Sequence, residues 1–207
     1  MGLVIGIVIA AVVVLVALVL VAMYNRLVRL RNRAENAWAQ VDVQLKRRHD
    51  LIPNLVETVK GYAAHERGTF DEVTQARTAA QRAQGPQAQA AAENVLTQAL
   101  GRLFAVAENY PQLRATENFQ QLQGQLSETE SNIAVARQVY NDTVLTYDNA
   151  LETLPTSIIA GIFNFREREY FQADDVDRAV PQVSFTAPDT PPAPDTPPAP
   201  EPPAPSS

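Results

Sequence analysis

The chain has 207 residues, 46% of them hydrophobic, and a formal net charge of -6. This composition is ordinary for a globular protein, and the length allows one domain of moderate size with additional segments. The chain contains no Cys, which excludes disulfide frameworks, thiolate catalysis, zinc fingers and iron–sulfur clusters. Two His residues exclude a His-rich metal site.

The charge is distributed unevenly along the chain. Residues 1–23 carry no charged side chain, and residues 24–48 carry seven Lys or Arg against two acids. Residues 49–207 carry ten basic side chains against twenty-one acidic ones. An acidic body of this kind disfavours binding to nucleic acid.

The first segment is apolar without interruption from Leu3 to Met23. As a helix it is roughly 31 Å long, which matches a hydrocarbon core of about 30 Å. A cleaved signal peptide is the alternative. It is disfavoured because the run exceeds a usual h-region, no basic residue precedes it, and VLVAMYN offers no small-x-small cleavage site. We therefore predict a transmembrane anchor over residues 1–23.

A collar of four arginines follows the apolar run directly: Arg26, Arg29, Arg31 and Arg33. By the positive-inside rule, this collar predicts a single-pass protein of the cell (inner) membrane with its N-terminus outside and the remainder in the cytoplasm. The same arginines are suited to anionic headgroups of the lipid bilayer. The alternative is that they act as a topological signal alone, without a bound lipid.

Apolar residues at steps of three and four continue beyond the anchor and predict four helices. Trp38 falls on the first apolar stripe and is expected to be buried, and Pro155 closes the last helix. Gly85-Pro86 separates the second and third helices. We interpret this pair as a reversal, although a mere kink would leave three equal rods. The expected helices span residues 24–64, 70–84, 87–109 and 114–154.

The stretch KRRHDLIPNL, residues 46–55, interrupts the first helix with charges and a proline. Pro53 frees the carbonyl group of His49, so either Asp50 caps a new helix or one helix continues with a kink. The apolar stripe keeps its phase, so we favour the kink, with the carbonyl group bonded by a side chain such as Asn54 or by water. His49 lies on the apolar stripe, which is typical of a hydrogen-bonded core residue.

The chain beyond Pro155 divides into two parts. SIIAGIFNFREREYF is apolar and aromatic and is long enough for two or three helical turns. From residue 186 a Pro/Ala tract with three acids predicts a disordered tail. The expected domains are therefore the anchor (1–23), a helical bundle (24–185) and the tail (186–207). The fold class is all-α, with the transmembrane helix continuing into an antiparallel up-and-down four-helix bundle.

Three blocks of sequence resemble the LemA family. YNRLVRLRNRAENAWAQVDVQLKRRHDLIPNLVETVKGYAAHE is similar to its signature, and NYPQLRATENFQQLQGQLSETESNIAVARQVYND and FREREYF are similar to its later blocks. The resemblance covers about residues 1–185. It implies a single-pass bacterial membrane protein with a soluble antiparallel helical bundle, and it brings no established enzymatic activity.

The residues favour a non-enzymatic function. His65 lacks the second His of an HExxH motif, and Glu57, Glu66, Glu128 and Glu130 fall on faces expected to be solvated. We predict no catalytic, cofactor-binding or metal-binding residue and no cofactor. The leading hypothesis is a membrane-anchored scaffold with a protein partner or self-association, for which Gly2, Gly6 and Ala10 offer a small-residue stripe. The alternatives are a sensor that transmits a signal through the first helix and an enzyme that uses scattered carboxylates.

Overall fold

The computed structural model describes residues 1–172. The predicted tail (186–207) and the last part of the predicted bundle lie outside the described residues. Over the described range the chain forms helices and no strand, which confirms the all-α prediction. The helices are α1 Gly2–Lys60, α2 Arg67–Arg82, α3 Pro86–Glu108, α4 Pro111–Arg114, α5 Glu117–Glu152 and α6 Thr156–Ile162.

Helix α1 is a single helix of 59 residues that contains both the apolar run and the first helix of the bundle. Residues 2–22 are exposed, and burial begins with Leu27 on the α5 side. Among the described helices, α1 is the one that is long and apolar enough to cross a membrane. The predicted continuity between anchor and bundle is therefore confirmed.

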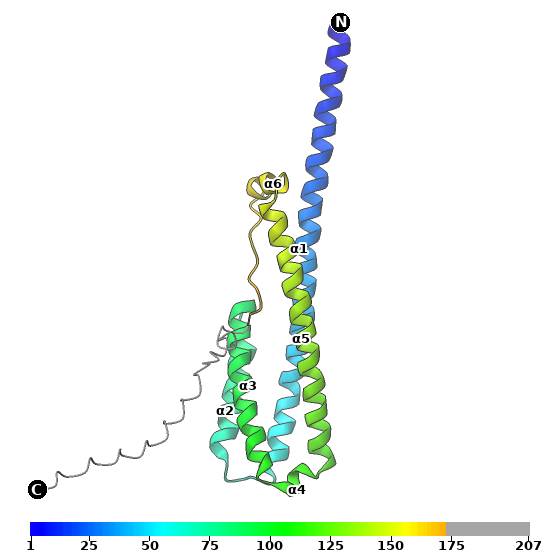
Figure 1. Ribbon diagram of the computed structural model, residues 1–207. Helices are drawn as coiled ribbons and strands as arrows, with labels where there is room; N and C mark the ends of the chain where they lie inside the picture. Colours follow the sequence, from blue (N-terminus) through cyan, green and yellow to red (C-terminus); the bar gives the residue numbers. More distant parts are fainter. Residues whose placement is uncertain (173–207) are drawn as a thin grey trace, which may run out of the picture. The chain divides into compact units, whose positions relative to one another are not determined.

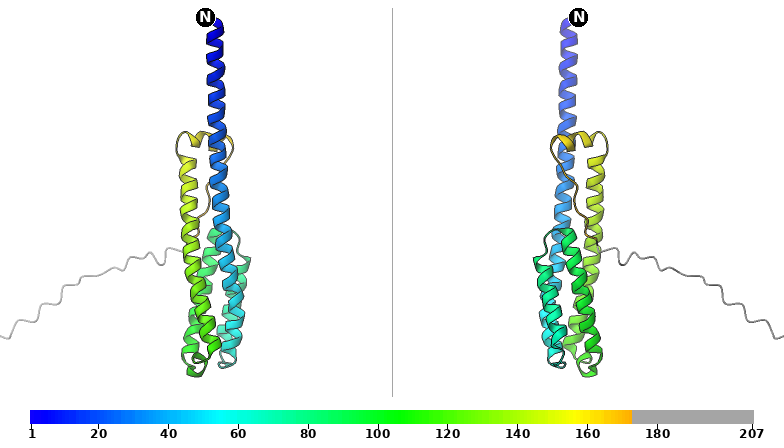
Figure 2. Two further views of the ribbon diagram at one scale, coloured as in Figure 1. Left: turned by 90° about the vertical axis from the view of Figure 1, so that its right-hand side faces the viewer. Right: turned by 90° about the vertical axis from the view of Figure 1, so that its left-hand side faces the viewer.

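Helices α1 and α5 pack side by side, and α2 and α3 form a hairpin beside the half of this pair that lies farther from the N-terminus (Figures 1 and 2). We call that half the far end. Its core combines residues of α1, α2, α3 and α5, including Val59, Val73, Leu103 and Phe119. The predicted four-helix bundle is thus present, but it covers only part of the α1–α5 pair.

The α2–α3 hairpin covers only part of the α1–α5 pair because its helices are shorter than α5. Helix α2 has 16 residues and α3 has 23, whereas α5 has 36. At about 1.5 Å per residue, α5 therefore extends roughly 20 Å beyond α3. Residues 163–172, which we call the strap, run back along the uncovered part of the α1–α5 pair after α6 (Figure 1).

Trp38, which was expected to be buried, is only half-buried. It packs at the edge of the core between α1, α5 and the strap, and its ring centroid lies 5.2 Å from that of Tyr140 and 5.7 Å from that of Phe171 in the strap. Ala34, Ala37 and Val41 hold the fully buried positions beside it. The indole therefore lies between α5 and the strap at the edge of the core.

Gly85 reverses the chain between α2 and α3, as predicted. Its φ of 86° and ψ of 157° lie in a region that is almost restricted to glycine. Pro86 then takes the first position of α3, where its missing N–H is not needed. An added Cβ atom would also lie 3.3 Å from a carboxylate oxygen of Glu169 in the strap.

Replacing this glycine provides a test of the turn. Gly85→Ala should lower the free energy of unfolding by about 1 to 3 kcal/mol, because alanine is strained at this φ and ψ. Gly101→Ala is the matched control, since Gly101 lies within α3 with open space around its Cα, and there alanine should stabilise by up to about 1 kcal/mol. Denaturant unfolding of the full chain in detergent micelles, followed by circular dichroism, measures both. Equal effects of the two substitutions would contradict this account of the turn.

Candidate functional site

A buried ion cluster joins the helices at the centre of the bundle. The Arg48 side chain of α1 is 3% exposed and bonds two acids. Its Nη1 atom lies 2.8 Å from Oε2 of Glu93 on α3, and its Nη2 atom lies 2.7 Å from Oε1 of Glu130 on α5. Nη2 also donates to the hydroxyl group of Thr97 at 2.8 Å. A single guanidinium group thus connects α1, α3 and α5.

His49 completes the pairing of Glu93 from the neighbouring position of α1. Its Nε2 atom lies 2.7 Å from Oε1 of Glu93, whose carboxylate accepts the bond. Gln89 donates to the same Oε1 atom at 3.0 Å and to the carbonyl oxygen of Ala80 on α2, also at 3.0 Å. His49 is therefore a hydrogen-bonded core residue, and α2 joins the same network.

The carbonyl group freed by Pro53 also enters this network. Helix α1 continues through Pro53, and the Nε atom of Arg77 on α2 donates to the carbonyl oxygen of His49 at 2.7 Å. The expected partner Asn54 is exposed, and its own carbonyl oxygen accepts from Thr58. Arg77 takes this role because α2 packs across the α1 face on which the carbonyl group lies free. The kink at Asp50, Pro53 and Asn54 itself stays a prediction.

The two carboxyl groups of the cluster have opposite pKa shifts. Burial alone would raise the pKa of Glu93, but the hydrogen bond and positive charge of His49, the Arg48 charge and the Gln89 hydrogen bond together lower it. Burial raises the pKa of Glu130, with partial compensation by Arg48 and a further increase from Glu93. The surroundings of Glu93 therefore favour its ionised form beside Arg48. The Glu130 side chain is 42% exposed, as expected of a solvated face, but it also pairs with Arg48 at the edge of the cluster, which was not expected.

Two adjacent side chains of α5 and a third, two turns later, bond the strap. The amide of Asn141 donates to the carbonyl oxygen of Phe171 at 3.1 Å and accepts from its N–H at 3.0 Å. The Tyr140 hydroxyl group donates to the carbonyl oxygen of Glu169 at 2.7 Å, and burial raises its pKa to about 12. Asp148 accepts from the N–H of Arg168 at 3.2 Å. The FREREYF block therefore holds the otherwise open α1–α5 pair together.

The predicted collar lies where α1 enters the bundle. Arg26, Arg29, Arg31 and Arg33 are all exposed. The guanidinium carbon of Arg31 lies 5.7 Å from the ring centroid of Phe165. A role of the collar toward lipids stays a prediction.

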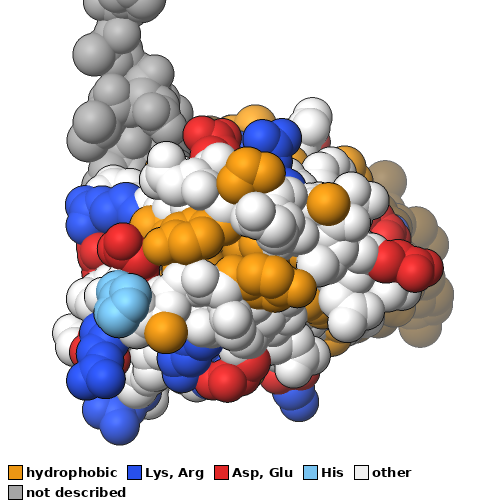
Figure 3. Space-filling view, turned by 90° about the horizontal axis from the view of Figure 1, so that it is seen from below, with side chains coloured by type: hydrophobic (Ala, Val, Ile, Leu, Met, Phe, Trp, Pro, Cys, Tyr) orange, Lys and Arg blue, Asp and Glu red, His pale blue; other side chains and the backbone are white. Residues whose placement is uncertain are grey.

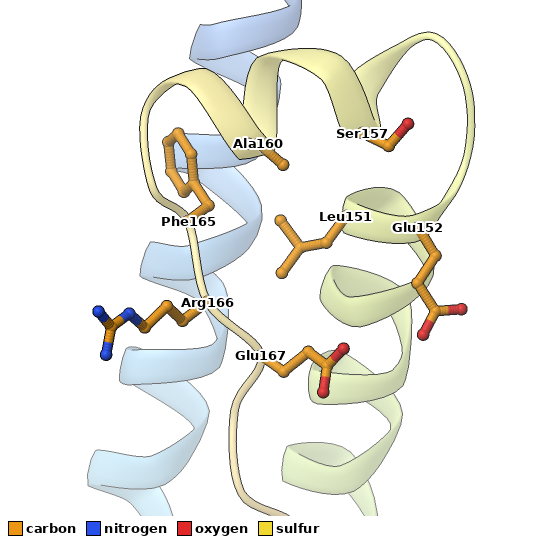
Figure 4. A pocket seen from close by; sticks show the side chains of 8 residues that line it. Leu151, Glu152, Ser157, Ala160, Phe165, Arg166 and Glu167 are labelled. Carbon is orange, nitrogen blue, oxygen red and sulfur yellow. The ribbon is translucent and has the colours of Figure 1, made fainter.

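Two open depressions lie beside α5. One of about 560 Å³ lies beneath α6, where Leu151 and Ala160 point toward each other and Glu152, Arg166 and Glu167 form a charged margin (Figure 4). The other, of about 480 Å³, is a groove between α1 and α5 that includes exposed Val43, Val135 and Val139. The lining of the first includes Ser157 but no His, and the lining of the second contains no ionisable side chain.

The far end of the bundle carries a mixed surface. Apolar side chains gather in its middle and charged side chains surround them (Figure 3). Tyr62 of the loop between α1 and α2 is exposed there, and Tyr110 before α4 is half-buried. Within residues 1–172, no group of three or more His, Asp or Glu side chains could hold a metal ion.

These features define a membrane-associated helical protein whose bundle is organised around a buried ion cluster. The chain belongs to the LemA family, because the family model matches residues 37–185. The matched range contains the ion cluster, the hairpin and the strap.

The chain is similar to magnetosome proteins and to a protein LemA. The magnetosome proteins MamQ 1 and MamQ 2 of Paramagnetospirillum magneticum are each 28% identical, over 77% of this chain and 70% of theirs. The protein LemA of Metamycoplasma hominis is 24% identical, over 74% of this chain and 71% of its own length.

The ion cluster gives a stability prediction. Glu93→Gln should lower the free energy of unfolding by about 3 to 5 kcal/mol, because Arg48 stays buried without its ionised partner. Glu57→Gln is the control, since its pairing with Lys60 is exposed and should contribute at most about 1 kcal/mol. Denaturant unfolding in micelles measures both, and in a double-mutant cycle Arg48→Met should recover part of the loss. Equal losses for the two single variants would contradict a buried pair.

The lowered pKa of Glu93 also predicts a pH dependence. A carboxyl group with a depressed pKa in the folded state contributes stability above its unfolded value of 4.5, and this contribution is lost as the pH falls through the folded pKa. The difference in unfolding free energy between the wild type and Glu93→Gln should therefore shrink as the pH falls through the folded pKa of Glu93. A difference that stays constant into the acid range would show that Glu93 is not ionised in the fold.

Proposed function

We propose that this protein is a non-catalytic scaffold at the cytoplasmic face of the membrane. Residues 1–23 form its anchor, residues 24–185 form its bundle, and the collar of Arg26, Arg29, Arg31 and Arg33 holds the bundle on the cytoplasmic side. The observation that carries the proposal is the uncovered groove between α1 and α5. Exposed valines line it on the two longest helices, and buried ion pairs and hydrogen bonds hold the bundle together.

The groove has the chemistry of a helix-docking surface. Val43, Val135 and Val139 are exposed along it, and the side-chain amide oxygen (Oε1) of Gln44 beside them is buried without a hydrogen-bond partner among the described residues. The α2–α3 hairpin and the strap cover other sides of the α1–α5 pair. An amphipathic helix with a hydrogen-bond donor would cover the valines and satisfy Gln44. Such a helix belongs to a partner protein or to a second copy of this chain.

The relatives support a common helical module, because proteins named for the magnetosome and a protein named LemA share most of their length with this chain. We propose that the module presents its groove to different partners in different membranes. A sensor that transmits a signal along α1 is the second candidate, and the continuity of α1 from the apolar run to Lys60 favours it.

Photocrosslinking tests the scaffold. A photoreactive amino acid at Val135 should yield a crosslinked product in native membranes, whereas the same residue at exposed Gln75 on α2 should yield none. A product of twice the chain mass of 22.7 kDa identifies self-association, and any other mass identifies a partner. Val43→Glu should abolish the product without unfolding the bundle. The scaffold proposal fails if the products at Val135 and Gln75 are the same, or if neither position yields one.

Cysteine labelling tests the orientation separately. The chain has no Cys, so a single introduced Cys is the only thiol that can react. In intact cells, Gln112→Cys at the far end should resist a membrane-impermeant thiol reagent and react once the cells are permeabilised. Gly2→Cys, at the other end of α1, should react without permeabilisation. The reverse pattern would place the bundle outside the cytoplasm.

A further inference from the structure

Helix α6 and the residues beside it expose a group of large apolar side chains. Leu154, Ile158, Ile162 and Phe163 are 78%, 56%, 69% and 56% exposed. Ile158 and Ile162 are four residues apart and share one face of α6, while Ile159 and Ala160 pack into the core. Four exposed large apolar side chains within ten residues form a patch of the kind that marks a protein or membrane contact.

This patch lies at the level of the apolar run of α1. An apolar depression of about 260 Å³ separates α6 from α1, lined on the α6 side by Pro155, Ile158 and Ile159. Its α1 side consists of residues from the last part of the apolar run: Leu15, Val16, Val19, Leu20 and Met23. Figure 1 shows α6 beside α1 at the point where α1 leaves the bundle. A bilayer crossed by the apolar run therefore reaches α6.

We propose that α6 is a second membrane contact, with residues 154–163 inserted into the lipid leaflet from which α1 emerges. From Val16 to Met23 the rise of the helix is about 10 Å, which agrees with the insertion depth of about 5 to 10 Å of interfacial helices. The depression between α6 and α1 offers room for lipid acyl chains. The inference rests on the anchor and not on the scaffold role.

The side chains around α6 follow the order of a lipid leaflet. Below the apolar layer lie aromatic rings, with the Tyr24 centroid 4.8 Å from Phe163 and 5.7 Å from Phe165. Next come charges, among them Arg31 over the Phe165 ring. Hydrocarbon, aromatic belt and charged headgroup region succeed one another in this order at a membrane surface.

Charged side chains lie on the opposite side of α6, so α6 has one apolar side and one charged side. Glu152, Arg166 and Glu167 form the margin of the depression beneath α6, toward the bundle (Figure 4). These charged groups favour water and headgroups, while Ile158 lines the depression against the apolar run and Ile162, one turn later on α6, is exposed. Two attachments, through α1 and α6, would stop the bundle from rotating about the α1 axis, so the α1–α5 groove would keep one orientation at the membrane.

Fluorescence of single-cysteine variants of the full chain in lipid nanodiscs tests the contact. An environment-sensitive dye on Ile162→Cys or Ile158→Cys should be quenched severalfold more by lipids with a nitroxide on the acyl chain than the same dye on Gln112→Cys. Iodide in the water should quench in the reverse order. Because both isoleucine side chains are exposed, their replacement should leave the circular dichroism spectrum unchanged.

Two results would overturn the proposal. Quenching by iodide at Ile162 equal to that at Gln112 would place α6 in water. The dye at position 162 could also be shielded from iodide in nanodiscs with several copies of the chain but not in nanodiscs with a single copy. That result would show that a second copy covers α6. Neither result would change the crosslinking at Val135, so a failure here is distinguishable from a failure of the scaffold proposal.

Discussion

The guanidinium group of Arg48 is the point at which the helices of the bundle meet. It is almost completely buried on α1, and its two terminal nitrogens are paired by Glu93 and Thr97 of α3 and by Glu130 of α5. A buried charge without its partner is strongly destabilising, so alternative packings of these helices are penalised. We therefore expect the cluster to favour this one register of α1, α3 and α5 over others.

The network around Arg48 also makes use of the irregularity in α1. Pro53 leaves the carbonyl oxygen of His49 without its helical donor, and Arg77 of α2 replaces that donor. His49 therefore holds α3 through its ring and α2 through its carbonyl group. Helix α1 itself continues into the apolar run, so the same helix that bears the cluster carries the membrane attachment.

The elements with a regular period could be predicted from the sequence. The apolar stripes indicated the four main helices, and Gly85-Pro86 indicated the reversal because glycine is flexible and proline suits the first position of a helix. The strap could not be predicted, since residues 163–172 have no period and are held by side chains of α5 such as Asn141. The half-burial of Trp38 depends on the same contacts.

The ion cluster was only partly visible in the sequence. Arg48 lies three residues after Leu45 and four before Ile52, and Glu93 lies three before Leu96, so each interrupts an apolar stripe. Two opposite charges on apolar stripes were a signal for a buried pair. A single sequence does not say which residues of separate helices meet, so the roles of Glu130 and Arg77 emerged only from the packing.

Hydrogen–deuterium exchange of the full chain tests most directly whether the cluster ties the hairpin to the α1–α5 pair. In Glu93→Gln, the amides of α2 and α3 should exchange faster than in the wild type. The amides of α5 beside the strap should keep their protection, because Tyr140, Asn141 and Asp148 hold that region independently. Unchanged exchange in α2 and α3, or an equal increase along the whole of α5, would contradict the account.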